Sequence, residues 1–93
     1  MTEDRIRAHV FVSGTVQGVR YRASTRDAAR EHGVAGWVRN LDDGRVEAVF
    51  EGPKGPVEAM IEWCHTGSRM ASVDDVGVSY EDPTGQSGFQ VRW

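Results

Sequence analysis

The chain has 93 residues, which is the length of one domain with a single modest hydrophobic core. Eleven Lys and Arg residues stand against fourteen Asp and Glu residues, and the net charge of −3 argues against a general nucleic-acid-binding protein. No apolar run approaches the ~20 residues that a membrane-spanning helix needs, and residues 1–5 do not begin a signal peptide, so we expect a cytoplasmic protein that does not enter the membrane.

The first half of the chain predicts a strand, a glycine loop, a helix and a hairpin. Apolar side chains such as Ala8 and Val10 fall on every second residue at the start, the pattern of a half-buried strand. Gly33 is a helix stop signal, and the dipeptide Asp43-Gly44 is typical of a tight hairpin turn. The expected elements are a strand at 6–13, a loop at 14–19, a helix at 21–32, and strands at 34–41 and 45–51.

The second half of the chain predicts one more helix and two more strands. Pro56 suits the first position of a helix, and the spacing of Val57, Met60 and Cys64 is that of one helical face, on which Cys64 is a buried thiol. The expected elements are a helix from 56 to near 67, a loop at 68–72, a strand at 76–80, a turn at 83–85 and a last strand at 89–93.

The order of these elements is βαββαβ with one additional strand at the end. Two right-handed crossovers would place both helices on one face of a mostly antiparallel sheet. We therefore predict an α+β fold, the ferredoxin-like sandwich, as a single domain over residues 1–93. This fold has many unrelated functions, so it does not assign one.

The loop between the first strand and the first helix is the first candidate site. Backbone N–H groups at a helix N-terminus attract anions, and glycines let a loop turn its amides towards a phosphate. The bland alternative is a tight strand-to-helix turn. Arg22 favours the anion site, because a cation in the first turn of a helix is disfavoured unless a negative group binds beside it. Arg20 reads as a surface residue.

Asn40 is the second candidate. Asn is depleted in strands, yet Asn40 shares a strand face with Val38. It is either a residue that leads into the hairpin turn or a carboxamide that donates and accepts hydrogen bonds at once and so fixes a water molecule.

Two segments resemble a known family. The run from Val12 to Arg22, with Gly14, Val16-Gln17-Gly18-Val19 and Tyr21-Arg22, is similar to the first signature of the acylphosphatases. The run Gly36-Trp37-Val38-Arg39-Asn40, with Gly44, Val46 and Gly52 beyond it, is similar to the second. The likeness covers nearly the whole chain. One departure is Tyr21, where the family usually has Phe, and the change keeps the aromatic ring.

The resemblance implies hydrolysis of the carboxyl-phosphate bond of acyl phosphates, without a metal or a cofactor. Arg22 would bind the phosphoryl group and Asn40 would orient the attacking water, as the two catalytic residues. The leaving carboxylate needs no protonation, because its conjugate acid has a pKa of about 4–5, so no general acid is required. The phosphate-binding set that the resemblance implies is Thr15, Val16, Gln17, Gly18, Val19, Arg20, Tyr21 and Arg22.

The residues also exclude or disfavour other functions. One cysteine and three scattered histidines offer neither a disulfide nor a metal-binding spacing. An RNA-recognition domain shares the element order, but residues 45–51 are acidic and carry one aromatic, so no nucleic-acid partner is expected. The remaining alternative is a non-catalytic module that binds phosphate or carbamoyl phosphate. The resemblance implies a small-molecule acyl phosphate and inorganic phosphate as the partners, and we expect the chain to be a monomer.

Overall fold

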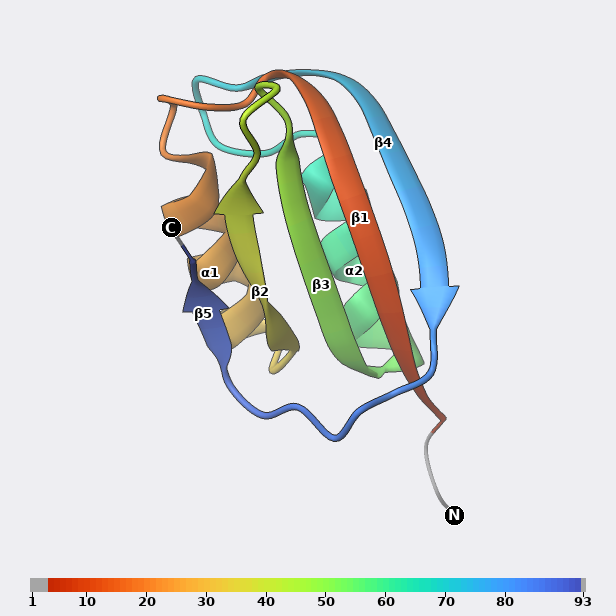
Figure 1. The fold of residues 1–93 in the computed structure, drawn as a ribbon. Helices are drawn as coiled ribbons and strands as arrows, with labels where there is room; N and C mark the ends of the chain where they lie inside the picture. Colours follow the sequence, from red (N-terminus) through yellow and green to blue (C-terminus); the bar gives the residue numbers. More distant parts are fainter. Residues whose placement is uncertain (1–3, 93) are drawn as a thin grey trace.

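The computed structural model describes residues 4–92 and contains two helices and five strands (Figure 1). In chain order they are β1 (Arg5–Thr15), α1 (Tyr21–Glu31), β2 (Ala35–Asn40), β3 (Val46–Pro53), α2 (Lys54–Cys64), β4 (Ser72–Glu81) and β5 (Phe89–Val91).

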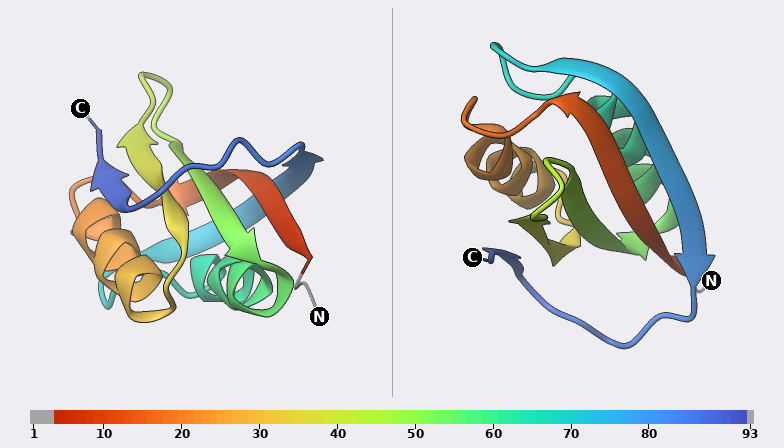
Figure 2. Two further views of the ribbon diagram at one scale, coloured as in Figure 1. Left: turned by 90° about the horizontal axis from the view of Figure 1, so that it is seen from below. Right: turned by 45° about the horizontal axis from the view of Figure 1, so that its top comes forward.

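The strands form one mixed sheet in the order β4-β1-β3-β2-β5. The first four pair antiparallel, whereas β5 pairs parallel to β2. Both helices lie on the same face of the sheet, and the other face is free of helices (Figures 1 and 2). This arrangement is the predicted ferredoxin-like α+β sandwich, and the prediction is confirmed. No helix of residues 4–92 is long and apolar enough to cross a membrane.

The hydrophobic core lies between the sheet and the two helices. The alternation in β1 turns Ala8, Val10 and Val12 towards the helices, and all three are fully buried. Tyr21 and Ala29 of α1 and Met60 of α2 pack against them. Cys64 is buried in this core as predicted, and burial raises the pKa of its thiol to about 12.

Most element bounds differ from the sequence-based expectation by one to four residues, among them those of α2, β4 and β5. Helix α2 begins at Lys54 rather than at Pro56, because the first N–H groups of any helix lack partners and proline is tolerated throughout the first turn. Strand β4 begins at Ser72, because β1 pairs with it as far as Thr15 despite its acidic residues. Strand β5 ends at Val91. Trp93 of the predicted last strand and residues 1–3 of the N-terminus lie outside the described residues.

The segment from β4 to β5 is held to the helix-free face by one buried carboxylate. The Glu51 side chain is fully buried in β3, and it accepts backbone N–H hydrogen bonds from Thr84, Gly85 and Gln86 at 3.0, 2.7 and 2.9 Å. Arg7 donates to the same carboxylate at 3.0 Å. Although burial opposes ionisation, these donors lower the Glu51 pKa to about 2. Glu51 thereby fixes the segment that leads into β5, at the edge of the site described next.

Candidate active site

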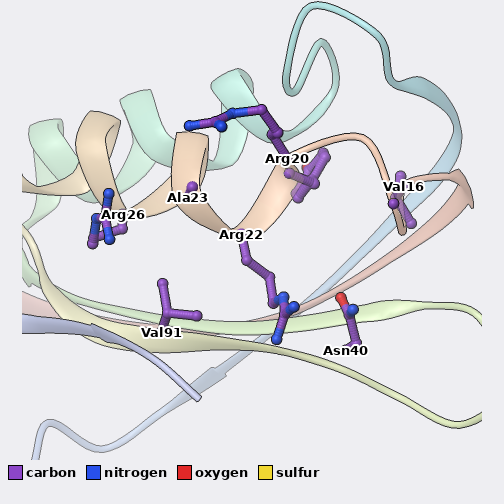
Figure 3. A pocket seen from close by; sticks show the side chains of 9 residues that line it. Val16, Arg20, Arg22, Ala23, Arg26, Asn40 and Val91 are labelled. Carbon is purple, nitrogen blue, oxygen red and sulfur yellow. The ribbon is translucent and has the colours of Figure 1, made fainter. Parts of the chain in front are cut away.

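A cavity of about 230 Å³ lies between the start of α1 and the edge of the sheet formed by β2 and β5 (Figure 3). It collects side chains from both signature segments, which are far apart in the sequence. The lining residues are Val16, Gly18, Arg20, Tyr21, Arg22, Ala23, Arg26, Asn40 and Val91. The structure therefore brings the two predicted catalytic residues, Arg22 and Asn40, into one cavity.

Arg22 reaches this cavity from the first turn of α1. Its guanidinium extends from the helix towards the sheet and lies beside the Asn40 carboxamide (Figure 3). One nitrogen of the guanidinium, Nη1, donates a hydrogen bond to the backbone carbonyl of Arg92 at 3.1 Å. The chain segment after β5 thus helps to hold the arginine against the cavity.

Asn40 is the last residue of β2 and lies opposite Val46 of β3. The strand alternation that buries Val38 in the core also turns Asn40 to the helix side of the sheet. Its Oδ1 is buried and accepts no hydrogen bond from any group of residues 4–92. A buried acceptor without a partner costs about 1–3 kcal/mol, so this atom is better suited to binding a ligand or a water molecule than to stabilising the fold.

The loop from Val16 to Arg20 carries the amides that face this region. Within the described part of the chain, no backbone N–H group of residues 16–20 is seen to donate a hydrogen bond. The loop needs positive φ at two positions, Gly18 at 73° and Arg20 at 61°. A non-glycine residue in the left-handed region costs of the order of 1–3 kcal/mol and is typical of functional loops. Helix α1 then begins at Tyr21, with Arg20 as its N-cap residue, and it has no side-chain cap within residues 4–92 and no acidic residue in its first turn.

Two side chains hold the shape of the loop, Gln17 from within it and Ser68 from outside it. The Gln17 amide donates to the carbonyls of Leu41 and Arg45 at 2.8 and 2.9 Å, and so ties the loop to the hairpin between β2 and β3. The Ser68 hydroxyl donates to the carbonyl of Val19 at 2.6 Å. Thr15 lies at the end of β1, paired with Ser72. Of the predicted phosphate-binding residues, Thr15, Gln17 and Val19 therefore do not line the cavity, and only their backbone could contribute to it.

Tyr21 is buried beneath the loop at the start of α1. Its hydroxyl donates a hydrogen bond to the backbone carbonyl of Cys64 at 2.8 Å, and its ring packs against that of Trp63. Burial raises the pKa of this phenol. The ring anchors the start of α1 to the end of α2, below the cavity. Arg20 is exposed and its guanidinium points away from Arg22 and Asn40, as expected of a surface residue (Figure 3).

Three lining residues were not predicted from the sequence: Ala23, Arg26 and Val91. Arg26 follows Arg22 by four positions, and residues four apart share one helix face. That spacing could have revealed it. Val91 could not have been found, because its position depends on β5 pairing with β2.

The electrostatic character of the cavity is positive, although the chain as a whole is negative. Three of the nine lining residues are arginines and none is acidic, although the Arg20 guanidinium points away from Arg22 and Asn40. Positive side chains, loop amides and a helix N-terminus together suit a dianion such as a phosphoryl group. Among residues 4–92, no group of three or more His, Cys, Asp or Glu side chains could hold a metal ion.

Comparison with known proteins gives consistent results. The family model for acylphosphatase matches residues 8–91. An acylphosphatase of Haloquadratum walsbyi is 75% identical over 92 residues, which cover 99% of each chain. The crystal structure of an acylphosphatase from Bacillus subtilis matches with a TM-score of 0.92 at 34% identity, covering 95% of this chain and 99% of that one. An acylphosphatase structure from Coxiella burnetii matches with a TM-score of 0.92 at 38% identity, covering 96% and 94%.

Proposed function

Because the chain belongs to the acylphosphatase family and hydrolyses acyl phosphates to carboxylate and inorganic phosphate, we propose that Arg22, Asn40 and the loop amides carry out this reaction. The observation that carries the proposal is the buried Oδ1 of Asn40, which has no hydrogen-bond partner among residues 4–92 and lies in the same cavity as Arg22. The comparisons support an enzyme over the non-catalytic binding module.

Arg22 and the loop bind the phosphoryl group of the substrate. A guanidinium offers two parallel N–H donors to phosphoryl oxygens, and such charge-assisted bonds are stronger than neutral ones. The N–H groups of residues 16–20 supply further donors, with Gly18 and Arg20 in the left-handed conformation that shapes the loop. These donors stabilise the charge on the equatorial oxygens in the transition state, where it is spread over three atoms.

Asn40 orients the attacking water. Its Oδ1 accepts a hydrogen bond from the water, which directs an oxygen lone pair at the phosphorus atom. The new P–O bond forms as the bond to the acyl oxygen breaks, and the carboxylate leaves with the bonding electrons. The proton of the water passes to the phosphate product. A carboxylate with a conjugate-acid pKa of about 4–5 leaves without a general acid, which agrees with a cavity lining that contains no carboxyl or imidazole group.

The finer features of the enzyme form part of the same proposal. We propose that it acts without a metal, because positioning and the charges of Arg22 and the loop supply what phosphoryl transfer requires. We further propose a cytoplasmic monomer that binds neither nucleic acid nor membrane. The net charge of −3 supports the first of these exclusions.

The test is hydrolysis of benzoyl phosphate by the purified protein in the presence of a chelator. We expect chelator-resistant turnover, competitive inhibition by inorganic phosphate, and loss of about 100- to 1000-fold in kcat in Asn40→Ala with KM little changed. Gln90→Ala is the matched control, because it removes an exposed carboxamide outside the cavity. Full turnover in Asn40→Ala, or turnover that the chelator abolishes, would overturn the proposal.

A further inference from the structure

The cavity extends beyond the position where the Arg22 guanidinium lies beside the Asn40 carboxamide. Ala23, Arg26 and Val91 line the part on the other side of Arg22, so that the Arg22 guanidinium lies between Arg26 and Asn40 in the view (Figure 3). None of these three residues has a role in holding the phosphoryl group or the water. Their part of the cavity is therefore available for the rest of the substrate.

The geometry of the reaction decides which part of the substrate enters there. In phosphoryl transfer the attacking and leaving oxygens lie roughly in line through the phosphorus atom. With the water at Asn40 and the phosphoryl group at Arg22, the leaving acyl group points away from Asn40. It therefore lies along Ala23 and Val91, with the Arg26 guanidinium beyond them (Figure 3).

Arg26 is placed to read charge on that acyl group. Its side chain is 36% exposed, and it contacts Asp27 through Nε and Nη2, both 3.1 Å from Oδ1. No hydrogen bond of its Nη1 is found within residues 4–92. Asp27 is 68% exposed and is not among the lining residues, whereas Arg26 is, so the ion pair places the cation and not the carboxylate at the cavity. A small neutral acyl group would fill only the apolar stretch and would make no ion pair with Arg26, which would keep only its contact with Asp27 and with water.

We propose, resting on the function proposed above, that the preferred substrates are acyl phosphates whose acyl group carries a second negative charge, such as a carboxylate, and that Arg26 is the residue that selects them. The hydrocarbon part of the acyl group packs on Ala23 and Val91, and the distal anion pairs with Arg26. Because the pair is partly exposed to water, its contribution is modest and affects discrimination rather than the chemical step.

The test compares two substrates that differ only in this charge, benzoyl phosphate and 4-carboxybenzoyl phosphate. The measured quantity is the ratio of their kcat/KM values in each variant. We expect the wild type to favour the carboxylated substrate, Arg26→Gln to lower the ratio about fivefold, and Arg26→Lys to restore part of it. Lys54→Gln removes one positive charge at the start of α2, outside the cavity, and should leave the ratio unchanged.

A fourth variant separates charge recognition from a structural role of the Arg26–Asp27 pair. Asp27→Asn breaks that ion pair but keeps Arg26, so the ratio should stay the same or rise. An equal fall of the ratio in Asp27→Asn and Arg26→Gln would overturn the inference. So would an unchanged ratio in Arg26→Gln. If the wild type hydrolyses both substrates with no preference, the inference fails while the proposed function stands, whereas absence of turnover with either substrate contradicts the proposed function itself.

Discussion

Buried carboxylates on the helix-free face of the sheet differ in hydrogen bonding from the buried carboxamide oxygen of Asn40 on the helix face. On the helix-free face, the carboxylates of Glu47 and Glu51 are buried and each accepts hydrogen bonds from several donors. On the helix face, Oδ1 of Asn40 is buried with no donor among residues 4–92. Most buried polar groups in folded proteins have a hydrogen-bond partner, and an exception calls for an explanation such as catalysis or ligand binding. The comparison therefore indicates that Glu47 and Glu51 stabilise the fold, whereas Asn40 serves to bind a ligand.

The charged side chains on the helix-free face pair with partners on other strands, far away in the sequence. Glu47 of β3 accepts hydrogen bonds from His9 of β1 and Arg39 of β2, and although burial opposes ionisation, these donors lower its pKa. Glu81 of β4 pairs with Arg7 and His9 of β1. These ion pairs and hydrogen bonds link β4, β1, β3 and β2, which are neighbours in the sheet, and so fix the register of these strands. We expect substitutions here to change stability, and substitutions in the cavity to change turnover.

The largest effect is expected at Arg22. Arg22→Lys keeps the positive charge but loses the forked pair of donors, so kcat/KM should fall by about two to three orders of magnitude. The free energy of unfolding should change by less than about 1 kcal/mol, because the side chain lines the cavity and a lysine keeps its charge there. Initial rates with benzoyl phosphate and urea unfolding of the same preparation measure both. If Arg22→Lys lost as much unfolding free energy as it lost in transition-state stabilisation, Arg22 would serve the fold as well as the reaction, and the two faces would not differ in this respect.

The second largest effect is expected at Glu51, where a substitution should reduce stability rather than turnover. Glu51→Gln replaces a buried carboxylate that accepts three backbone N–H bonds and an Arg7 bond with a neutral amide. Removal of one partner of such a network should cost about 3 kcal/mol of unfolding free energy. Urea unfolding at neutral pH measures it. Arg5→Gln, at an exposed position near the same end of the sheet, is the control and should change stability by less than about 0.5 kcal/mol.

The pH dependence of stability follows from the same carboxylate. The Glu51 pKa is about 2 in the folded chain against an ordinary value of 4.5, so its contribution is fully present above about pH 5 and is lost as the pH falls from 4.5 towards 2. The stability difference between the wild type and Glu51→Gln should therefore shrink from about 3 kcal/mol at pH 7 to under about 1 kcal/mol near pH 2. Urea titrations at several pH values follow it. If the stability difference between the wild type and Glu51→Gln did not vary with pH, the shape of the Glu51 side chain and not its charge would be what stabilises the fold.

The smallest effect is expected at Tyr21. Tyr21→Phe keeps the buried ring but removes the hydroxyl that donates to the Cys64 carbonyl, and should cost about 1 kcal/mol. Thermal or urea unfolding measures it. A cost above about 3 kcal/mol would mean that the hydroxyl does more than hold the ends of the two helices together.

The sequence predicted the fold because its local signals are strong. The alternation around Ala8 and Val10 and the stop at Gly33 place β1 and α1 to within two residues. Strand β4 was underestimated because Asp74 and Asp75 obscure the alternation there, whereas pairing with β1 sets its true length. Helix α2 begins two residues earlier than the sequence predicts, because the pattern places Pro56 at the first helical position.

The site was predictable only in part. Arg22 and Asn40 stand in recognisable motifs, and the structure brings them into one cavity. The contacts that position them are not local: Gln17 reaches the β2–β3 hairpin, and Val91 enters the cavity only because β5 pairs with β2. The Glu51 network likewise depends on a connection more than thirty residues further along the chain. Sequence patterns carry no information on such distant pairings.

The unfolding free energy of Asn40→Ala, measured beside its turnover, tests the central claim most directly. The variant removes a buried acceptor that has no partner within residues 4–92, so stability should stay within about 0.5 kcal/mol of the wild type or rise, while kcat falls at least about 100-fold. A loss of more than about 2 kcal/mol of stability with turnover retained would contradict the account, because Asn40 would then serve the fold as Glu51 does.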